Sequence, residues 1–321
     1  MKYIAIIILS LFVAGCQGNN HQGKEGDKER SEIPQRVVCM SSTHIAAMSK
    51  LGIDSLIVGV SGGEYLTNKL ILNGLSTGKI KDIGYESSLD FETLISLKPD
   101  ILFTYDINGE NSAVIEKIKR LGINTIVIND FHLNNPIERL ESIREIGKIF
   151  NCSEKADSII KSISNNYNSL TKLTAGLEKK KILLNTPWKG TWYIPGSENY
   201  FSKMVSDAGG VIVGSKDGEV KSHPYDTEEI LRYSRECEIW ILQNSITSIK
   251  ELKSSNHLFE DFTPLIKGNV YNNTLRINKN GGNDYWETGA MEPDKILEDL
   301  IRIIHPEILE EGVFNYFERI Y

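Results

Sequence analysis

Short apolar runs alternate with amphipathic stretches from Arg36 onwards, and this alternation limits the fold more than any other feature of the 321 residues. Residues 37–40 have the composition of a strand, and residues 44–51 follow with helical spacing as far as Gly52. Further strand-like runs lie at 55–60, 101–105, 124–128, 182–184 and 239–242, with helical segments between most of them. Strands that alternate with helices form βαβ units and a largely parallel sheet. The pattern therefore predicts an α/β fold.

One segment in the middle of the chain is much longer than the other helical segments. Residues 153–177 contain no proline and no glycine before Gly176, and their apolar side chains recur at helical spacing. A helix of this length spans about 37 Å, which is enough to cross one face of a domain. Because a second α/β set begins at 182–184, we predict two Rossmann-like lobes with mainly parallel central sheets at 36–150 and 179–321, joined by one rigid helix at 151–178.

The two predicted lobes share a weak internal repeat. Residues 91–95 precede the strand-like run at 101 in the same way that residues 228–231 precede the run at 239. Both segments read as helices with an acidic first turn that lead into a buried strand. The alternative is that any βαβ protein shows such a pattern.

The first residues form a targeting signal rather than part of the fold. Lys2 precedes an apolar run at 3–14, which is shorter than the roughly 20 residues of a bilayer span and fits the apolar part of a secretory signal. The run ends in Val13-Ala14-Gly15-Cys16, which resembles a bacterial lipoprotein signal. The resemblance implies a signal peptide at 1–15 and lipidation of Cys16. A plain secretory signal with an incidental cysteine is the alternative.

The segment that follows the expected lipid anchor is almost wholly polar. Such a composition cannot bury enough apolar surface to offset the chain entropy lost on folding. We therefore predict a lipid-anchored flexible tether at 16–35. The expected location is a bacterial cell membrane, with the soluble domain in the periplasm or extracytoplasmic space.

Charge and cysteine usage exclude some classes of protein. The chain has 36 Lys and Arg against 43 Asp and Glu and no long basic block, which argues against a nucleic-acid partner. No spacing such as CxxC or HExxH is present, so we predict no dedicated metal site. Besides Cys16, the cysteines are Cys39, Cys152 and Cys237, for which buried free thiols are expected and one disulfide is the alternative.

Several stretches resemble the periplasmic-binding-protein family that captures iron chelates, haem and cobalamin for ABC importers. They are Arg-Val-Val-Cys-Met-Ser-Ser-Thr at 36–43, Asp-Phe-Glu-Thr-Leu-Ile-Ser-Leu-Lys-Pro-Asp-Ile-Leu at 90–102, Leu-Gly-Ile at 121–123, and 295–304 followed by His-Pro-Glu. The resemblance implies a monomeric binding protein that is no enzyme and has no cofactor. Its ligand would be a metal chelate (an iron-siderophore, haem or a corrinoid) held between the lobes and delivered to an ABC permease dimer with its ATPase.

The same resemblance implies two docking residues. In that family an acidic residue on each lobe meets arginines of the permease, and Glu92 matches the first of them. The internal repeat places the second at Glu228, with Glu229 and Glu198 as rivals. The alternative for Glu92 is an acidic first-turn residue that complements the helix dipole.

Ligands of open α/β sheets lie beyond the carboxyl ends of the strands. The ligand-binding residues predicted from this rule are Ser42, His44, Tyr65, Tyr105, Trp188, Trp192, Tyr193, Tyr285 and Trp286. Aromatic loops favour a large planar or aryl-bearing ligand, although Trp188 and Trp192 could instead pack on their own sheet. The residues His44, His223 and Tyr105 could ligate a haem iron or a bare cation.

The predicted ligand loops contain few basic residues. Lys189, Lys221 and Arg276 are the ones that stand out. Because so few lysines and arginines lie in these loops, cobalamin or a neutral hydroxamate chelate fits better as the ligand than an anionic catecholate or carboxylate chelate.

Two alternatives come from other functional classes. An α/β enzyme would need a phosphate-binding or nucleophile motif, but residues 59–63 lack the spacing GxGxxG and the chain has no GxSxG. A ligand-binding sensor or surface capture protein without its own importer is the other alternative.

Overall fold

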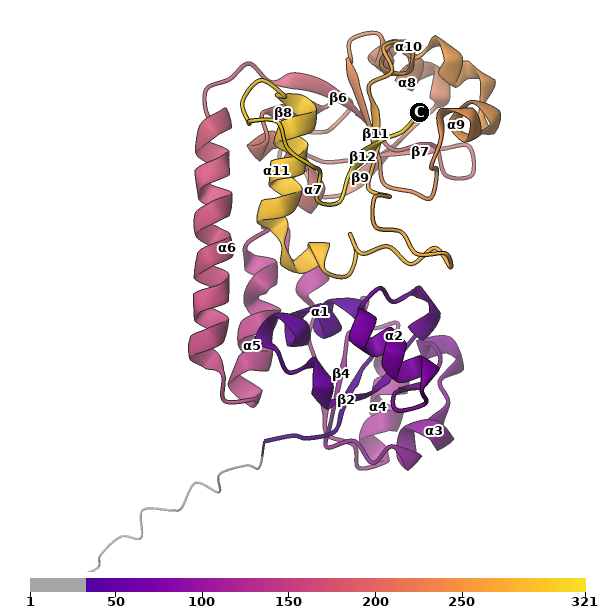
Figure 1. Cartoon of the computed structure of the whole chain (residues 1–321). Coiled ribbons are helices and arrows are strands. Elements are labelled where there is room, and N and C mark those ends of the chain that lie inside the picture. The colour runs from indigo at the N-terminus through magenta and orange to yellow at the C-terminus, as the bar shows by residue number, and fades with distance from the viewer. Residues whose placement is uncertain (1–32) are drawn as a thin grey trace, which may run out of the picture. The chain divides into compact units, whose positions relative to one another are not determined.

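The computed structural model describes residues 33–321, which form one compact unit (Figure 1). The predicted signal peptide at 1–15 and the lipidation at Cys16 lie outside the described residues, as does most of the predicted tether. Within the described part, two five-stranded sheets form the centres of two lobes. The fold predicted from the alternating pattern, two Rossmann-like lobes joined by a long helix, is confirmed.

The first lobe has an entirely parallel sheet with the strand order β3-β2-β1-β4-β5. Its strands are β1 (Val37–Cys39), β2 (Ile57–Val60), β3 (Lys81–Asp82), β4 (Ile101–Thr104) and β5 (Thr125–Val127). Its helices are α1 (Ser42–Leu51), α2 (Lys69–Ser76), α3 (Phe91–Ser96) and α4 (Ser112–Arg120). The hydroxyl of Ser41 accepts from the amide of Thr43 at the start of α1, and Gly52 ends this helix in the left-handed conformation with a φ of 68°.

The second lobe has the strand order β12-β11-β10-β6-β8, in which β12 alone is antiparallel to its neighbour. Its strands are β6 (Lys180–Leu184), β8 (Gly210–Ile212), β10 (Ile239–Leu242), β11 (Val270–Asn272) and β12 (Glu318–Arg319). A separate antiparallel hairpin consists of β7 (Trp192–Pro195) and β9 (Ser222–Tyr225). The helices are α7 (Tyr200–Asp207), α8 (Thr227–Ser234), α9 (Ile249–Ser255), α10 (Thr263–Ile266) and α11 (Pro293–Ile304).

Two helices lie between the lobes in the sequence, α5 (Glu141–Ile149) and α6 (Ser153–Thr174). Helix α6 packs on α5 beside the first lobe and on α11 beside the second, so it runs along both lobes (Figure 1). It ends three residues before the predicted position, because Ala175 is extended and Gly176 takes a φ of 88°. A separate 3-10 turn at Glu138–Leu140 leads directly into α5.

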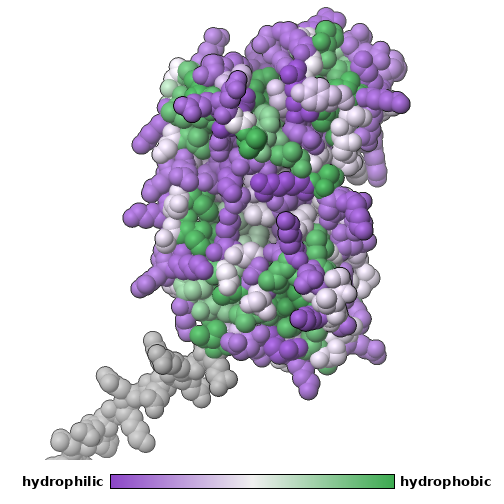
Figure 2. Space-filling model, in the orientation of Figure 1, coloured by the Kyte–Doolittle hydropathy of each residue, from purple (hydrophilic) through white to green (hydrophobic). Residues whose placement is uncertain are grey.

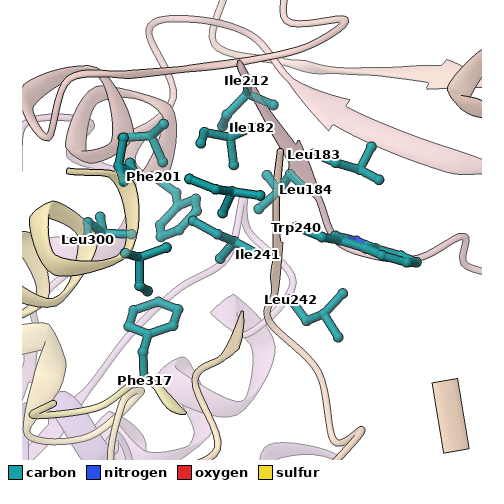
Figure 3. Packing of buried hydrophobic residues seen from close by; sticks show 14 of the residues in the cluster. Ile182, Leu183, Leu184, Phe201, Ile212, Trp240, Ile241, Leu242, Leu300 and Phe317 are labelled. Carbon is teal, nitrogen blue, oxygen red and sulfur yellow. The ribbon is translucent and has the colours of Figure 1, made fainter. Parts of the chain in front are cut away.

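The core of the second lobe lies between its sheet and the helices that cover it (Figure 3). Ile182, Ile241 and Leu300 are fully buried there. A cluster of aromatic rings lies on the sheet, with the centroids of Trp240 and Phe262 5.1 Å apart. Burial of this apolar surface is the main contribution to the stability of the lobe.

Cys39, Cys152 and Cys237 are all free thiols, as expected in preference to a disulfide. Burial raises the pKa of the Cys237 thiol to about 12. Most of the surface in Figure 2 is hydrophilic, with small separate hydrophobic areas. In the described range of the chain, no helix has both the length and the apolar character needed to cross a bilayer.

Candidate functional site

The carboxyl ends of four parallel strands open on one cavity of about 510 Å³ that residues of both lobes line. Strands β1, β2 and β4 contribute Ser41, Ser61 and Tyr105, the residues at or just beyond their carboxyl ends. Strand β10 contributes Asn244 from the second lobe. Because this is the edge where open α/β sheets bind ligands, the cavity is the candidate site.

The first-lobe side of the cavity carries three tyrosines. Tyr105 meets Phe131 edge to face, with ring centroids 6.1 Å apart. Burial, and next the neighbouring carboxylate of Glu86, raise the pKa of Tyr105 to about 12. The ring of Tyr85 lies against Gly62, where a Cβ atom would come within 2.8 Å of Cε1, so this glycine makes room for the ring. Tyr65 is the third tyrosine and is half exposed.

The second-lobe side is built by a loop at 277–288. The side-chain oxygen of Asn283 accepts from the amide of Tyr285 at 3.0 Å, and this turn sends neighbouring side chains in different directions. Trp286 is 53% exposed and lines the cavity. Tyr285 is buried instead, and its hydroxyl accepts from Gln243 at 3.0 Å.

The same loop lies against the first lobe. The side chains of Asn278 and Asn280 donate to the carbonyls of Leu66 and Glu64, at 2.9 and 3.1 Å. A Cβ atom on Gly282 would lie 2.0 Å from the carbonyl oxygen of Tyr65, so the two main chains meet without a side chain between them. The loop therefore closes one side of the cavity.

Four of the nine predicted ligand-binding residues line this cavity: Ser42, Tyr65, Tyr105 and Trp286. His44 does not, because it is fully buried with Nε2 3.3 Å from the carbonyl of Ile128, and burial lowers its pKa. The structure places His44 in the core rather than in the lining of the cavity, and its contact with a ligand or a haem iron stays a prediction.

Two predicted aromatic contacts are core residues instead. Trp192 is fully buried, donates from Nε1 to the carbonyl of Leu184 at 2.7 Å and stacks on Trp240. This is the alternative of packing on its own sheet, and it arises because Trp192 faces inward on β7. Tyr285 is likewise enclosed, only 3% exposed, and is not among the residues that line the cavity.

Two further aromatic residues are exposed but lie elsewhere. Trp188 and Tyr193 have ring centroids 6.5 Å apart at the hairpin, and neither lines the cavity. Lys189 places its ammonium 4.5 Å from the ring centre of Trp188. His223 pairs with Glu219 at 2.7 Å and also lies outside the cavity.

The structure adds lining residues that the sequence analysis did not include. They include Ser61, Tyr85, Glu86, Asn244 and Ser245. Ser61 and Asn244 follow predicted strands closely, so the strand-end rule was a sufficient signal for them. Tyr85 and Glu86 follow β3, which has only two exposed residues and no apolar run to reveal it.

The predicted docking residues occupy equivalent positions in the two lobes. Glu92 and Glu228 are each the second residue of a helix. The helices begin alike, because the N-cap residues Asp90 and Asp226 each accept a hydrogen bond from the amide three residues further on, at 3.0 and 2.7 Å. Both glutamates are exposed, and neither forms an ion pair within residues 33–321. Of the rivals, Glu198 pairs with Lys203 at 2.8 Å.

A second cavity of about 790 Å³ lies beside α6 and α7. In it the hydroxyl of Tyr167 donates to Asp207 at 2.7 Å. Although it is larger, only the smaller cavity combines the carboxyl ends of strands from both lobes. Among the residues that the structure describes, no three His, Cys, Asp or Glu side chains gather in a way that could hold a metal ion.

Comparison with known proteins gives a family match over most of the chain. The model of the periplasmic binding protein family matches residues 37–274. An uncharacterised lipoprotein of Methanocaldococcus jannaschii is 25% identical over 292 residues, which are 88% of this chain and 68% of that protein. Two proteins of Bacillus subtilis are also similar. An uncharacterised ABC transporter substrate-binding lipoprotein is 20% identical (64% of this chain, 69% of that protein), and an Fe(3+)-citrate-binding protein is 21% identical (84% and 89%).

Solved structures share the fold. A periplasmic solute binding protein from Veillonella parvula has a TM-score of 0.66 at 20% identity, covering 88% of this chain and 84% of that one. A periplasmic haem-binding protein from Pseudomonas aeruginosa has a TM-score of 0.64 at 16% identity (87% and 95%). A periplasmic vitamin B12 binding protein of Vibrio cholerae has a TM-score of 0.59 at 13% identity (85% and 97%).

Proposed function

The chain belongs to the periplasmic binding protein family, and from this premise we propose that it is the substrate-binding lipoprotein of an ABC importer that captures a metal chelate. The observation that carries the proposal is the cavity of about 510 Å³ between the two lobes. Its size falls within the range of small-molecule sites. A ligand held there contacts both lobes at once, which suits capture and release rather than chemical conversion.

The side chains that line the cavity support a chelate as the ligand. Tyr65, Tyr105 and Trp286 offer flat rings that bury much area at little entropic cost. Ser42 and Asn244 add neutral hydrogen-bonding groups. The names of similar proteins refer to Fe(3+)-citrate, haem and vitamin B12, all of which are metal chelates.

Delivery to the permease would use the two exposed glutamates. Glu92 and Glu228 are placed alike in α3 and α8, and each carboxylate is free to meet an arginine of a partner. Two such contacts on separate lobes would set the orientation of the protein on a permease dimer.

Anchoring at Cys16 completes the proposed function, and the relatives described as lipoproteins support it. Acyl chains add about 0.8 kcal/mol of membrane affinity for each buried CH₂ group. Replacement Cys16→Ala should move the protein from the membrane fraction to the soluble fraction. Retention of the variant in the membrane fraction would contradict anchoring at this residue.

The central experiment is purification from the source followed by an absorption spectrum in the near-ultraviolet and visible range. Haem, ferric chelates and corrinoids have distinct bands, so a bound chelate identifies its own class. Calorimetric titration with representatives of each class then measures saturable binding. A colourless protein that binds none of them would show that the ligand is not a metal chelate.

A further inference from the structure

The cavity between the lobes has no basic side chain in its lining, and we propose that it selects chelates whose net charge is zero or positive. This inference rests on the proposed function, because it assigns a charge to the ligand of the same site. Two carboxylates, of Glu86 and Glu287, are the charged groups in that lining. The lining contains no lysine, arginine or histidine.

The basic residues that stand out in the neighbouring sequence all lie outside the lining. Lys189 is engaged with the ring of Trp188, and Lys221 is exposed. The guanidinium of Arg276 pairs with Asp284 at 3.1 Å and lies 4.6 Å from the ring centre of Tyr316. In the positions that they occupy, none of these three side chains can therefore neutralise an anionic ligand in the cavity.

The two carboxylates differ in what they already bind. Glu287 accepts from the amide and hydroxyl of Thr67, both at 2.7 Å, and from the amide of Asn68 at 3.1 Å. Its oxygens are therefore occupied within the protein. Glu86 is half-buried, and its carboxylate lies near the hydroxyl of Tyr105, whose pKa it helps to raise. Its Oε1 nevertheless has no donor at hydrogen-bonding geometry among the described residues.

A buried carboxylate oxygen without a donor is unfavourable, since it has lost water and gained nothing in return. A ligand that brings a cationic or hydrogen-bond-donating group to Oε1 of Glu86 would relieve that penalty. A ligand that brings a carboxylate would add repulsion in a partly dehydrated site. Glu86 is therefore the residue that sets the charge preference.

The aromatic residues act in the same direction. The faces of Tyr65, Tyr85 and Trp286 carry partial negative charge and attract cations. The serine and asparagine side chains of the lining hydrogen-bond to neutral groups without favouring an anion. Neutral and cationic chelates thus find partners over the whole cavity, whereas an anionic chelate finds none of opposite charge.

The test uses one chelate scaffold in three charge states. A ferric linear trihydroxamate with a terminal amine is cationic, its N-acetyl form is neutral, and its N-succinyl form is anionic. Two more pairs extend the test to other scaffolds: haem dimethyl ester with haem, and cyanocobalamin with its monocarboxylic acid. Dissociation constants are measured by calorimetry for the purified lipoprotein, for Glu86→Gln, and for Glu110→Gln as a control at an exposed position outside the cavity.

For any scaffold that binds, we expect the form without the added carboxylate to bind about tenfold more tightly or better. Glu86→Gln should reduce this ratio severalfold, while Glu110→Gln should leave it unchanged. Equal or tighter binding of the carboxylate form would overturn the charge preference and leave the proposed function intact. An unchanged ratio in Glu86→Gln would overturn the role of Glu86. Absence of saturable binding for every probe would overturn the proposed function and this inference with it.

Discussion

Glu287 of the second lobe accepts two hydrogen bonds from Thr67 of the first lobe, one from its amide and one from its hydroxyl, both at 2.7 Å. The amide of Asn68, which caps α2, donates to the other carboxylate oxygen at 3.1 Å. Glu287 is only 3% exposed, so these bonds are shielded from water. Burial raises the pKa of Glu287, although the hydrogen bonds from Thr67 act against that shift. This contact holds the two lobes together beside the cavity.

Removal of the hydroxyl at this contact should weaken the whole fold. Thr67→Val keeps the shape of the side chain but loses the hydroxyl bonds to Glu287 and to Asp284, the latter at 3.0 Å. We expect the free energy of unfolding to fall by about 1 to 2 kcal/mol, because hydrogen bonds to charged groups are stronger than average. Urea unfolding at constant m-value measures the change. The control Thr77→Val removes an exposed hydroxyl bonded within its own helix turn and should change stability by less than about 0.5 kcal/mol. Equal losses of stability in the two variants would show that the hydroxyl of Thr67 contributes nothing special to the stability of the fold.

A second contact between the lobes should make stability depend on pH. Glu292 accepts from Lys50 of the first lobe, from Lys295 at 2.8 Å and from the hydroxyl of Tyr316. Burial raises its pKa, but these hydrogen bonds outweigh burial and hold the pKa below its ordinary value of 4.5. A carboxylate with a lowered pKa stabilises the fold above its ordinary pKa, and this contribution is lost as the pH falls through the lowered value.

Glu292→Gln should therefore destabilise the protein by about 1 to 3 kcal/mol at neutral pH. The difference from the unmodified protein should shrink as the pH falls below 4.5. Unfolding curves across this pH range provide the measurement. Glu298→Gln, which removes the partner of Arg302 on the surface of the same helix, should cost no more than about 1 kcal/mol. A difference that stays constant with pH would show that the charge of Glu292 does not matter.

Charge reversal at the proposed docking residues should separate transport from binding. Glu92→Arg and Glu228→Arg each place a cation where the permease is expected to present an arginine. We expect uptake of the chelate to fall by about tenfold or more in cells, with no change in the dissociation constant of the isolated protein. Glu110→Arg, at another exposed position of the first lobe, should support normal uptake. Normal uptake by both reversed variants would contradict docking through Glu92 and Glu228.

Two tryptophans should give opposite results on truncation. Trp286→Ala should weaken ligand binding by about tenfold with little loss of stability, since its ring is 53% exposed in the cavity lining. Trp192→Ala should lower stability by about 3 to 5 kcal/mol, because it empties a fully buried site. Calorimetry and thermal unfolding measure the two quantities. Trp188→Ala, exposed outside the cavity, should change neither of them, and a loss of affinity there would place the site at the hairpin instead.

Long periodic segments of the sequence predicted their elements well. The strand at Ile239–Leu242 has the predicted bounds, because all four of its residues are buried in one unbroken apolar run. Helix α2 was missed, since only Ile71 and Gly74 are buried in it and Gly74 is a poor helix former. The alternation along β7 was also missed, although it separates the buried Trp192 from the exposed Tyr193.

The cavity was predicted only where a lining residue lies near a recognisable strand or helix end. Ser42 and Tyr105 satisfy that condition. Glu86 does not, because β3 has no apolar pattern. The contact between Thr67 and Glu287 joins residues 220 positions apart, and no local pattern in either segment indicates the other.

The absence of a side chain at Gly282 lets the main chains of the two lobes meet at one side of the cavity. The main chain there lies so close to the carbonyl of Tyr65 that a single added carbon atom would act as a wedge. This side of the cavity is therefore bounded by backbone against backbone, which does not adapt by rotamer changes as a side-chain contact would. Selection of ligands by size would then depend on a position that itself offers the ligand no functional group.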